Sequence, residues 1–261
     1  EYTKHLTEYF KSLGLKPGYN NSYTHLFNFV SGSELGRVNV IKLQGLKVKT
    51  QLHQDWAPLP YSKSGSLAGK EIVFAGYGIN APETDEQKPY NSFTDLDVKD
   101  KWVMMLRFLP EDIEGKRRVH LQRYAKLFDK VMQARNAGAA GVIFVSGPTS
   151  NSKSDVIPFK ETDLSPTYSL PIISISDKLA QQILEKAGKS LKPLQKELDT
   201  GKVSPGFNIP KVSLSSHIEI DHKNTKGRNI VATLKVPGAK ETIVIGAHGD
   251  HLGQGKSPSS L

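Results

Sequence analysis

The feature that most constrains the fold is a helical stripe that leads through a glycine into a short apolar run, between residues 119 and 147. Apolar side chains recur three or four residues apart, and Gly138 follows them as a helix stop. The run 141–147, GVIFVSG, then predicts a strand. A helix that passes directly into a strand is typical of an α/β fold. The stripe consists of Leu121, Tyr124, Ala125, Phe128, Val131 and Met132.

Similar patterns predict further elements on both sides of this unit. An N-terminal helix over 2–13 ends at Gly14, and a second helix over 177–188 follows a strand and has Asp177 as a plausible N-cap. Turn-rich passages at about 45–70 and 199–211 mark candidate domain borders, so the outer pieces could form one domain that the middle interrupts. Strands are predicted at 24–30, 36–45, 71–79, 99–110, 170–176, 211–222, 228–238 and 241–250.

Composition excludes several classes of site and partner. The 261 residues include no cysteine, so a bound metal would need His, Asp or Glu ligands. The net charge of +9 comes from scattered residues, and the one tight basic cluster, 115–120, lacks the aromatic side chains that stack on bases. No run of eighteen apolar residues is present. We therefore expect neither a nucleic-acid partner nor a membrane-spanning helix.

Candidate chemistry is concentrated near residue 248. The apolar run 243–245 and Gly246 predict a buried parallel strand, and His248 follows its carboxyl end, where α/β sheets bind ligands. A neutral imidazole there could bind Zn²⁺, and Asp250 could accept its second N–H and orient it. The same residues are equally compatible with a hydrogen-bonded turn in which Asp250 accepts backbone N–H groups.

The order of parts resembles the zinc-dependent aminopeptidases and glutamate-carboxypeptidase-like peptidases that carry an inserted protease-associated domain. The opening helix and turn (2–27) look like the start of the family's peptidase domain. The strands and helix from 71 to 176 are very similar to its inserted domain, and "RNIVATLKVPGAKETIVIGAHGDHLG" (228–253) looks like its first metal motif, His-x-Asp-His-x-Gly. The resemblance implies an α/β fold: residues 1–45 and 206–261 form the N-terminal part of a zinc-exopeptidase domain. A mixed α+β, strand-rich protease-associated domain at 46–205 interrupts it.

The same resemblance implies a function for the intact protein. His248 would be a zinc ligand, and Asp250 the catalytic-site carboxylate that orients it. Two zinc ions and a peptide substrate are typical of the family, as is export from the cytoplasm, either by secretion or to the periplasm. The family's other ligands follow this motif, so we expect the partner of these residues to be a C-terminal half of the catalytic domain. We expect the 261-residue chain alone to bind zinc weakly and to be inactive.

A second interpretation belongs to another functional class. The chain could be a non-catalytic interaction module whose protease-associated domain presents a surface to peptides or other partners. Other catalytic motifs are weaker: GYGINA (76–81) imitates a dinucleotide fingerprint but precedes Pro82 and a polar loop instead of a helix. His120, His217 and His222 lack metal-ligand spacing, and we interpret them as surface or structural residues.

Overall fold

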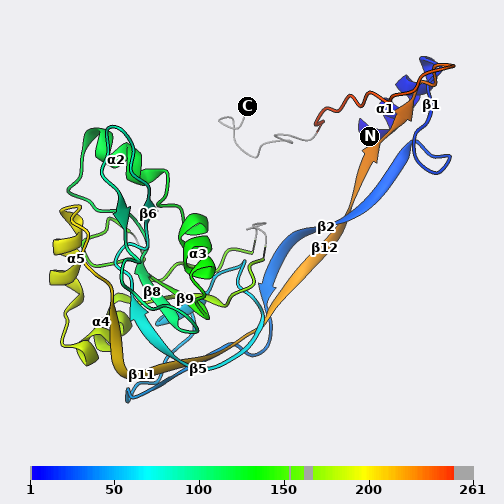
Figure 1. Ribbon diagram of the computed structural model, residues 1–261. Coiled ribbons are helices and arrows are strands. Elements are labelled where there is room, and N and C mark those ends of the chain that lie inside the picture. Colours follow the sequence, from blue (N-terminus) through cyan, green and yellow to red (C-terminus); the bar gives the residue numbers. More distant parts are fainter. Residues whose placement is uncertain (1, 153, 162–166, 250–261) are drawn as a thin grey trace. The chain divides into compact units, whose positions relative to one another are not determined.

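The computed structural model describes residues 2–152, 154–161 and 167–249, which divide into two compact units (Figure 1). The smaller unit contains residues 1–28 and 226–261, and the larger one contains residues 29–225. Among the described residues, no helix is both long and apolar enough to span a membrane.

The smaller unit contains the predicted N-terminal helix and short strand pairings. Helix α1 (Tyr2–Ser12) ends where Gly14 adopts a positive φ of 72°, as the glycine stop predicts. Strand β1 (Lys16–Pro17) pairs with β13 (Ala232–Thr233). Strands β2 (Thr24–Leu35) and β12 (Ile220–Ile230) pair with each other and continue from this unit into the larger one.

The larger unit is built around a seven-stranded mixed sheet in the order β3-β11-β5-β8-β9-β10-β4. Its centre is parallel, from β5 through β8 and β9 to β10, whereas β11 and β4 join antiparallel. The strands are β3 (Val40–Gln44), β4 (Trp56–Pro58), β5 (Gly65–Phe74), β8 (Trp102–Leu106), β9 (Gly141–Val145), β10 (Ile172–Ile175) and β11 (Phe207–Ile218). A separate pair consists of β6 (Asn80–Ala81) and β7 (Tyr90–Asn91).

The sheet is buried on both faces, as its continuous apolar strands require. Successive side chains of β8 alternate between two hydrophobic clusters: Trp102 and Met104 lie in one, and Val103 and Met105 lie in the other. The first cluster packs under α4 (Asp177–Leu184) and α5 (Leu191–Asp199), and the second packs under α3 (Leu127–Asn136). In Figure 1 these helices lie on opposite sides of the central strands.

The helix predicted across the stripe is divided in two. Helix α2 (Gly115–Gln122), which includes the basic cluster, ends before α3 begins. The division has a packing reason: Leu121 of α2 lies in the first cluster, whereas Val131 of α3 lies in the second. One straight helix cannot present its apolar stripe to both faces of a sheet.

Two further differences concern helix ends. The N-cap of α4 is Ser176, whose hydroxyl accepts the Leu179 N–H at 3.2 Å, and the predicted cap Asp177 is instead the first helical residue. A 3₁₀ turn (Glu185–Ala187) follows α4. Helix α5 was not predicted, although Leu191, Leu194 and Leu198 have helical spacing and are buried.

The larger unit begins earlier and ends later in the sequence than the limits 46–205 predicted for the protease-associated domain. Strands β3 and β11, which we assigned to the outer domain by the limits 46–205, pair with each other in the same sheet as β5. The hydrogen-bonded ladder therefore extends the larger unit to residues 29–225. Assignment of the outer residues to a peptidase domain remains a prediction.

The strand predicted at 241–250 is absent from the described part of that segment, 241–249. Ile243, Val244 and Ile245 are 88%, 87% and 93% exposed. A buried strand needs neighbours that accept its backbone hydrogen bonds and cover its side chains. No strand among the described residues pairs with this run.

Candidate functional site

Of the two residues predicted for the metal site, His248 lies among the described residues. His248 is exposed and lies in the segment after the apolar run, and the next residue, Gly249, lies against the ring of Tyr2. Asp250 lies outside the described residues. No group of three or more His, Asp or Glu side chains among the described residues could hold a metal ion. A single imidazole does not suffice for tight zinc binding, so we derive no catalytic step through zinc from this geometry.

The carboxyl ends of the parallel strands are the other place where an α/β sheet is expected to bind a ligand. At β8 this position is filled by Lys130 of α3, which is completely buried. Its ammonium group donates to the carbonyl oxygens of Leu106 and Arg107, at 2.8 and 3.0 Å, and to that of Phe108. It also lies 5.6 Å from the centre of the Tyr77 ring.

Burial lowers the pKa of Lys130 well below its ordinary value. The three carbonyl acceptors act in the opposite direction, because only the protonated amine has three N–H donors to offer. We conclude that Lys130 is held as an ammonium by its acceptors and closes the end of β8.

A second buried cluster closes the neighbouring strand ends. The Asp199 carboxylate at the end of α5 accepts hydrogen bonds from the Tyr77 hydroxyl and from the Thr149 hydroxyl, the latter at 2.8 Å. Gln195, one turn earlier, accepts the Thr149 N–H at 3.1 Å. Burial, followed by the hydrogen bond to Asp199, raises the pKa of Tyr77, so the phenol stays protonated. These contacts fix the loop after β9 and leave the strand ends occupied by the protein's own side chains.

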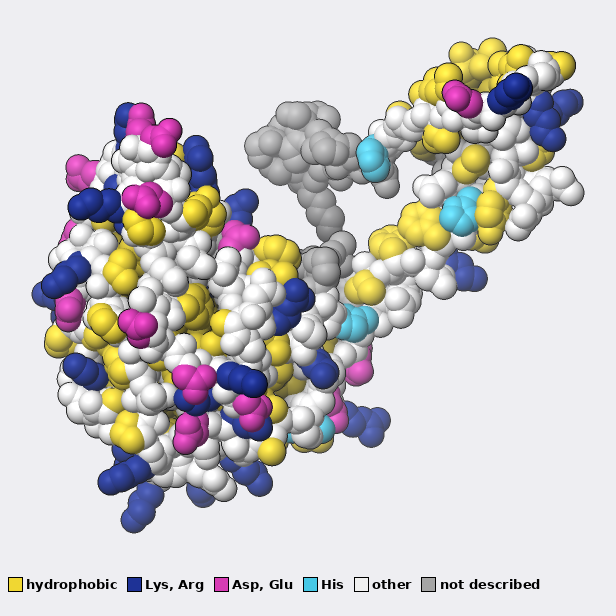
Figure 2. Space-filling view, in the orientation of Figure 1, with side chains coloured by type: hydrophobic (Ala, Val, Ile, Leu, Met, Phe, Trp, Pro, Cys, Tyr) yellow, Lys and Arg dark blue, Asp and Glu magenta, His cyan; other side chains and the backbone are white. Residues whose placement is uncertain are grey.

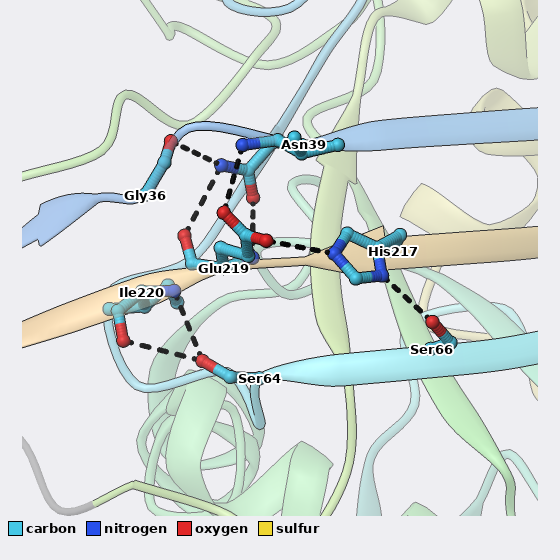
Figure 3. A network of polar contacts seen from close by, with 8 residues as sticks. Gly36, Asn39, Ser64, Ser66, His217, Glu219 and Ile220 are labelled. Atoms are coloured by element: carbon cyan, nitrogen blue, oxygen red, sulfur yellow. Dashed lines mark hydrogen bonds and ion pairs between the residues drawn. The ribbon is translucent and has the colours of Figure 1, made fainter.

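A Ser–His–Glu relay lies at the surface where β5 meets β11 (Figure 3). The Ser66 hydroxyl lies 2.7 Å from His217 Nδ1, and His217 Nε2 lies 3.1 Å from Glu219 Oε1. Because the carboxylate accepts from Nε2, the neutral ring carries its proton there, and Nδ1 accepts the Ser66 hydroxyl. The second carboxylate oxygen accepts the Val38 N–H at 2.9 Å.

The relay has the bonding order of a hydrolase triad but not its environment. Ser66 is exposed, and the side chains of His217 and Glu219 are 36% and 39% exposed, so water competes for each group. Asn39 adds contacts that tie the loop before β3 to Glu219, by accepting its backbone N–H at 2.9 Å and donating to its carbonyl oxygen at 3.2 Å. The arrangement therefore supports the structural interpretation made for His217.

Glu219, the acidic residue of the relay, has a shifted pKa. The Val38 N–H, and after it His217, lower the pKa of Glu219 below its ordinary range. A lowered folded-state pKa contributes stability that is present above the unfolded-state pKa and is lost as pH falls through the folded-state value.

We expect His217→Ala to raise the Glu219 pKa only partly, because the larger contribution, from Val38, remains. Carboxyl carbon chemical shifts followed by NMR across an acid titration measure this pKa. Ser66→Ala, which leaves both contacts to Glu219 intact, should not change it. A complete return to the ordinary range in His217→Ala would show that the imidazole is the main cause.

Comparison with known protein families identifies the central part of the chain. Residues 62–183 match the family model of the PA domain, the protease-associated domain. The matched residues run from the segment before β5 into α4 and include the whole parallel part of the sheet. The chain thus contains a protease-associated domain within its larger unit. No curated protein matches the chain.

This match confirms one part of the predictions from sequence and leaves the other untested. The presence of a protease-associated domain is confirmed, as is the mixed, strand-rich character of the fold. The peptidase domain, its zinc ions and the roles of His248 and Asp250 stay predictions. Sequence reasoning missed Lys130 and Asp199, because charged residues within helical patterns are usually solvated. For Asp199 the sequence holds a weak indication of burial: it ends a helix whose leucines have helical spacing and define a buried face.

Proposed function

We propose that this chain is part of a zinc-dependent exopeptidase that removes terminal residues from peptides, with the protease-associated domain inserted into its catalytic domain. The observation that carries the proposal is the order of two features: a protease-associated domain at 62–183, and the His-x-Asp-His-x-Gly motif at 248–253. In this proposal His248 is a zinc ligand, and Asp250 is the carboxylate that orients it. Residues outside these 261 supply the remaining ligands, and the natural protein works outside the cytoplasm.

The chemistry follows from the donor types that the motif offers. Zinc, when bound, polarises the scissile carbonyl group and lowers the pKa of a water molecule. The proposed role of this chain is to help hold the ion. A neutral His248 would bind it through one ring nitrogen, and Asp250 would accept the N–H of the other ring nitrogen. That bond would fix the tautomer and the direction of the ring.

The exposure of the run 243–245 also supports this proposal. Three successive β-branched residues have the composition of a strand that is buried on both faces. Pairing of this run with further strands would bring His248 to the carboxyl edge of a sheet, the position typical of an α/β active site.

A second candidate function is a non-catalytic interaction module. It is favoured by the packing of the larger unit, whose sheet is covered on both faces and whose parallel strand ends are closed by Lys130 and Asp199. Such a unit offers its outer surface for interactions. In both candidates the protease-associated domain itself is non-catalytic.

The deciding experiment measures zinc content and exopeptidase activity on the natural protein and on the 261-residue chain. For the natural protein we expect zinc that co-purifies with it and hydrolysis of aminoacyl or peptidyl 4-nitroanilides that a chelator abolishes. We expect the 261-residue chain to cleave none of them. A natural protein that binds no zinc and cleaves neither class of substrate would overturn the peptidase proposal and favour the interaction module.

A further inference from the structure

Strand β3 is an outer strand of the seven-stranded sheet, with β11 as its one neighbour. Its side chains alternate strictly: Ile41 and Leu43 are buried in the core, whereas Val40, Lys42 and Gln44 are exposed. Among the described residues, no backbone hydrogen bond joins the outer side of β3 to another segment. An outer strand of this kind presents unpaired N–H and C=O groups to which an extended peptide can pair.

A hollow lies just beyond the end of β3. The chain turns at Gly45, whose φ is 87° and where a Cβ atom would lie 1.8 Å from the Lys211 carbonyl oxygen, so only glycine fits. The next three residues, 46–48, then form one wall of a hollow of about 350 Å³. The end of α4 and the turn after it form the other wall, through Gln182, Glu185 and Lys186.

The floor of the hollow is apolar and its rim is basic. Leu46 and Val48 are half-buried against the first hydrophobic cluster. Lys47 and Lys186 line the hollow, and Lys42 and Lys49 lie close to it in sequence. These four exposed lysines form no ion pair with any described residue. The acidic residue of the hollow, Glu185, accepts a hydrogen bond from Gln181. Figure 2 shows dark blue side chains projecting from the lower left of the larger unit, near the place where Figure 1 labels β11.

This combination selects one kind of partner. Lys42 on β3 and the lysines that follow the strand oppose pairing with a neutral or basic strand, because the incoming backbone gains no charge compensation for the ammonium groups that it crowds. A strand with carboxylates at alternate positions meets those ammonium groups with opposite charge. We propose that the outer side of β3, together with the hollow beyond it, is a docking site for an extended acidic peptide segment that adds to the sheet as a further strand. This inference concerns the protease-associated unit and does not rest on the proposed peptidase activity.

The test measures peptide binding to the complete 261-residue chain by fluorescence anisotropy. The probe is a labelled short peptide of alternating valine and glutamate, and the comparison peptides carry lysine in place of glutamate or N-methyl groups on alternate backbone nitrogens. We expect the acidic peptide to bind, the basic peptide not to bind, and N-methylation to abolish binding because it removes the donors that pair with β3.

Charge-reversal variants locate the site. Lys47→Glu combined with Lys186→Glu should weaken binding of the acidic peptide at least about tenfold. The matched control combines Lys99→Glu, before β8, with Lys178→Glu, in the first turn of α4; both lysines are exposed, and the net charge change is the same. Thermal unfolding verifies that both double variants fold. Failure of the acidic peptide to bind, equal loss in both double variants, or undiminished binding of the N-methylated peptide would each overturn the docking proposal.

Discussion

Replacing Lys130 by Met is expected to lower the free energy of unfolding by about 4 kcal/mol. This loss is typical of variants that remove one partner of a buried polar network. Methionine fills nearly the same volume, so little packing is lost. The change instead leaves the carbonyl oxygens of residues 106–108 without the ammonium group that they share. Leu106, at the end of β8, is buried, and Arg107 and Phe108 just beyond it are partly buried, so water replaces the lost donor least well at Leu106.

Urea unfolding followed by tryptophan fluorescence measures this loss, since Trp56 and Trp102 are both buried in the larger unit. Lys126→Met is the matched control: it lies just before α3, its side chain is exposed, and it makes no capping hydrogen bond. The control should change stability by less than about 0.5 kcal/mol. Similar stability for Lys130→Met and the wild type would mean that the three carbonyls do not depend on the ammonium group.

The proposed peptidase function predicts that His248→Ala in the natural protein reduces exopeptidase activity by at least about a thousandfold, because zinc would supply several kcal/mol of stabilisation to the transition state. Asp250→Asn should act more mildly, by about 10–100-fold, because it leaves the ligand in place and disturbs only its orientation. Zinc content, measured on the same samples, should fall strongly in the first variant and partly in the second.

His222→Ala is the control for this pair. His222 is exposed and lies in β12, where its contact is with the Thr167 hydroxyl at 3.3 Å. Its replacement should change neither zinc content nor activity. Full activity in His248→Ala would show that His248 is not a zinc ligand, even if the natural protein proved to be a zinc peptidase with other ligands.

The parts of the fold that the sequence could predict are those in which local pattern and burial agree. The strand Gly141–Val145 follows a helix that ends at a positive-φ glycine, Gly138, and all five of its residues are buried. The division between α2 and α3 could not be predicted in this way. Their apolar residues form one continuous stripe, and only the alternation of the sheet's side chains shows that Leu121 and Val131 belong to opposite faces.

The polar contacts show the same limit more sharply. Lys130 occurs in a helical pattern rich in charged residues, and nothing in that pattern distinguishes it from solvated neighbours such as Lys126. Its burial depends on three carbonyl oxygens contributed by residues more than twenty positions earlier. For the candidate metal site the sequence offers one motif. Among the described residues, no group of three or more His, Asp or Glu side chains could hold a metal ion. The ligands of a metal site usually come from segments distant in sequence, so one local motif does not reveal them.

The exposed run 243–245 also affects how the chain behaves at high concentration. Exposed segments of β-branched residues that pair with no strand are the kind that stack between molecules into intermolecular sheets. Lys240 and Glu241, which only Thr242 separates from the run, act as gatekeepers, since their charges oppose close stacking of identical segments. Salt weakens that repulsion, so self-association of the 261-residue chain should increase with ionic strength as well as with concentration.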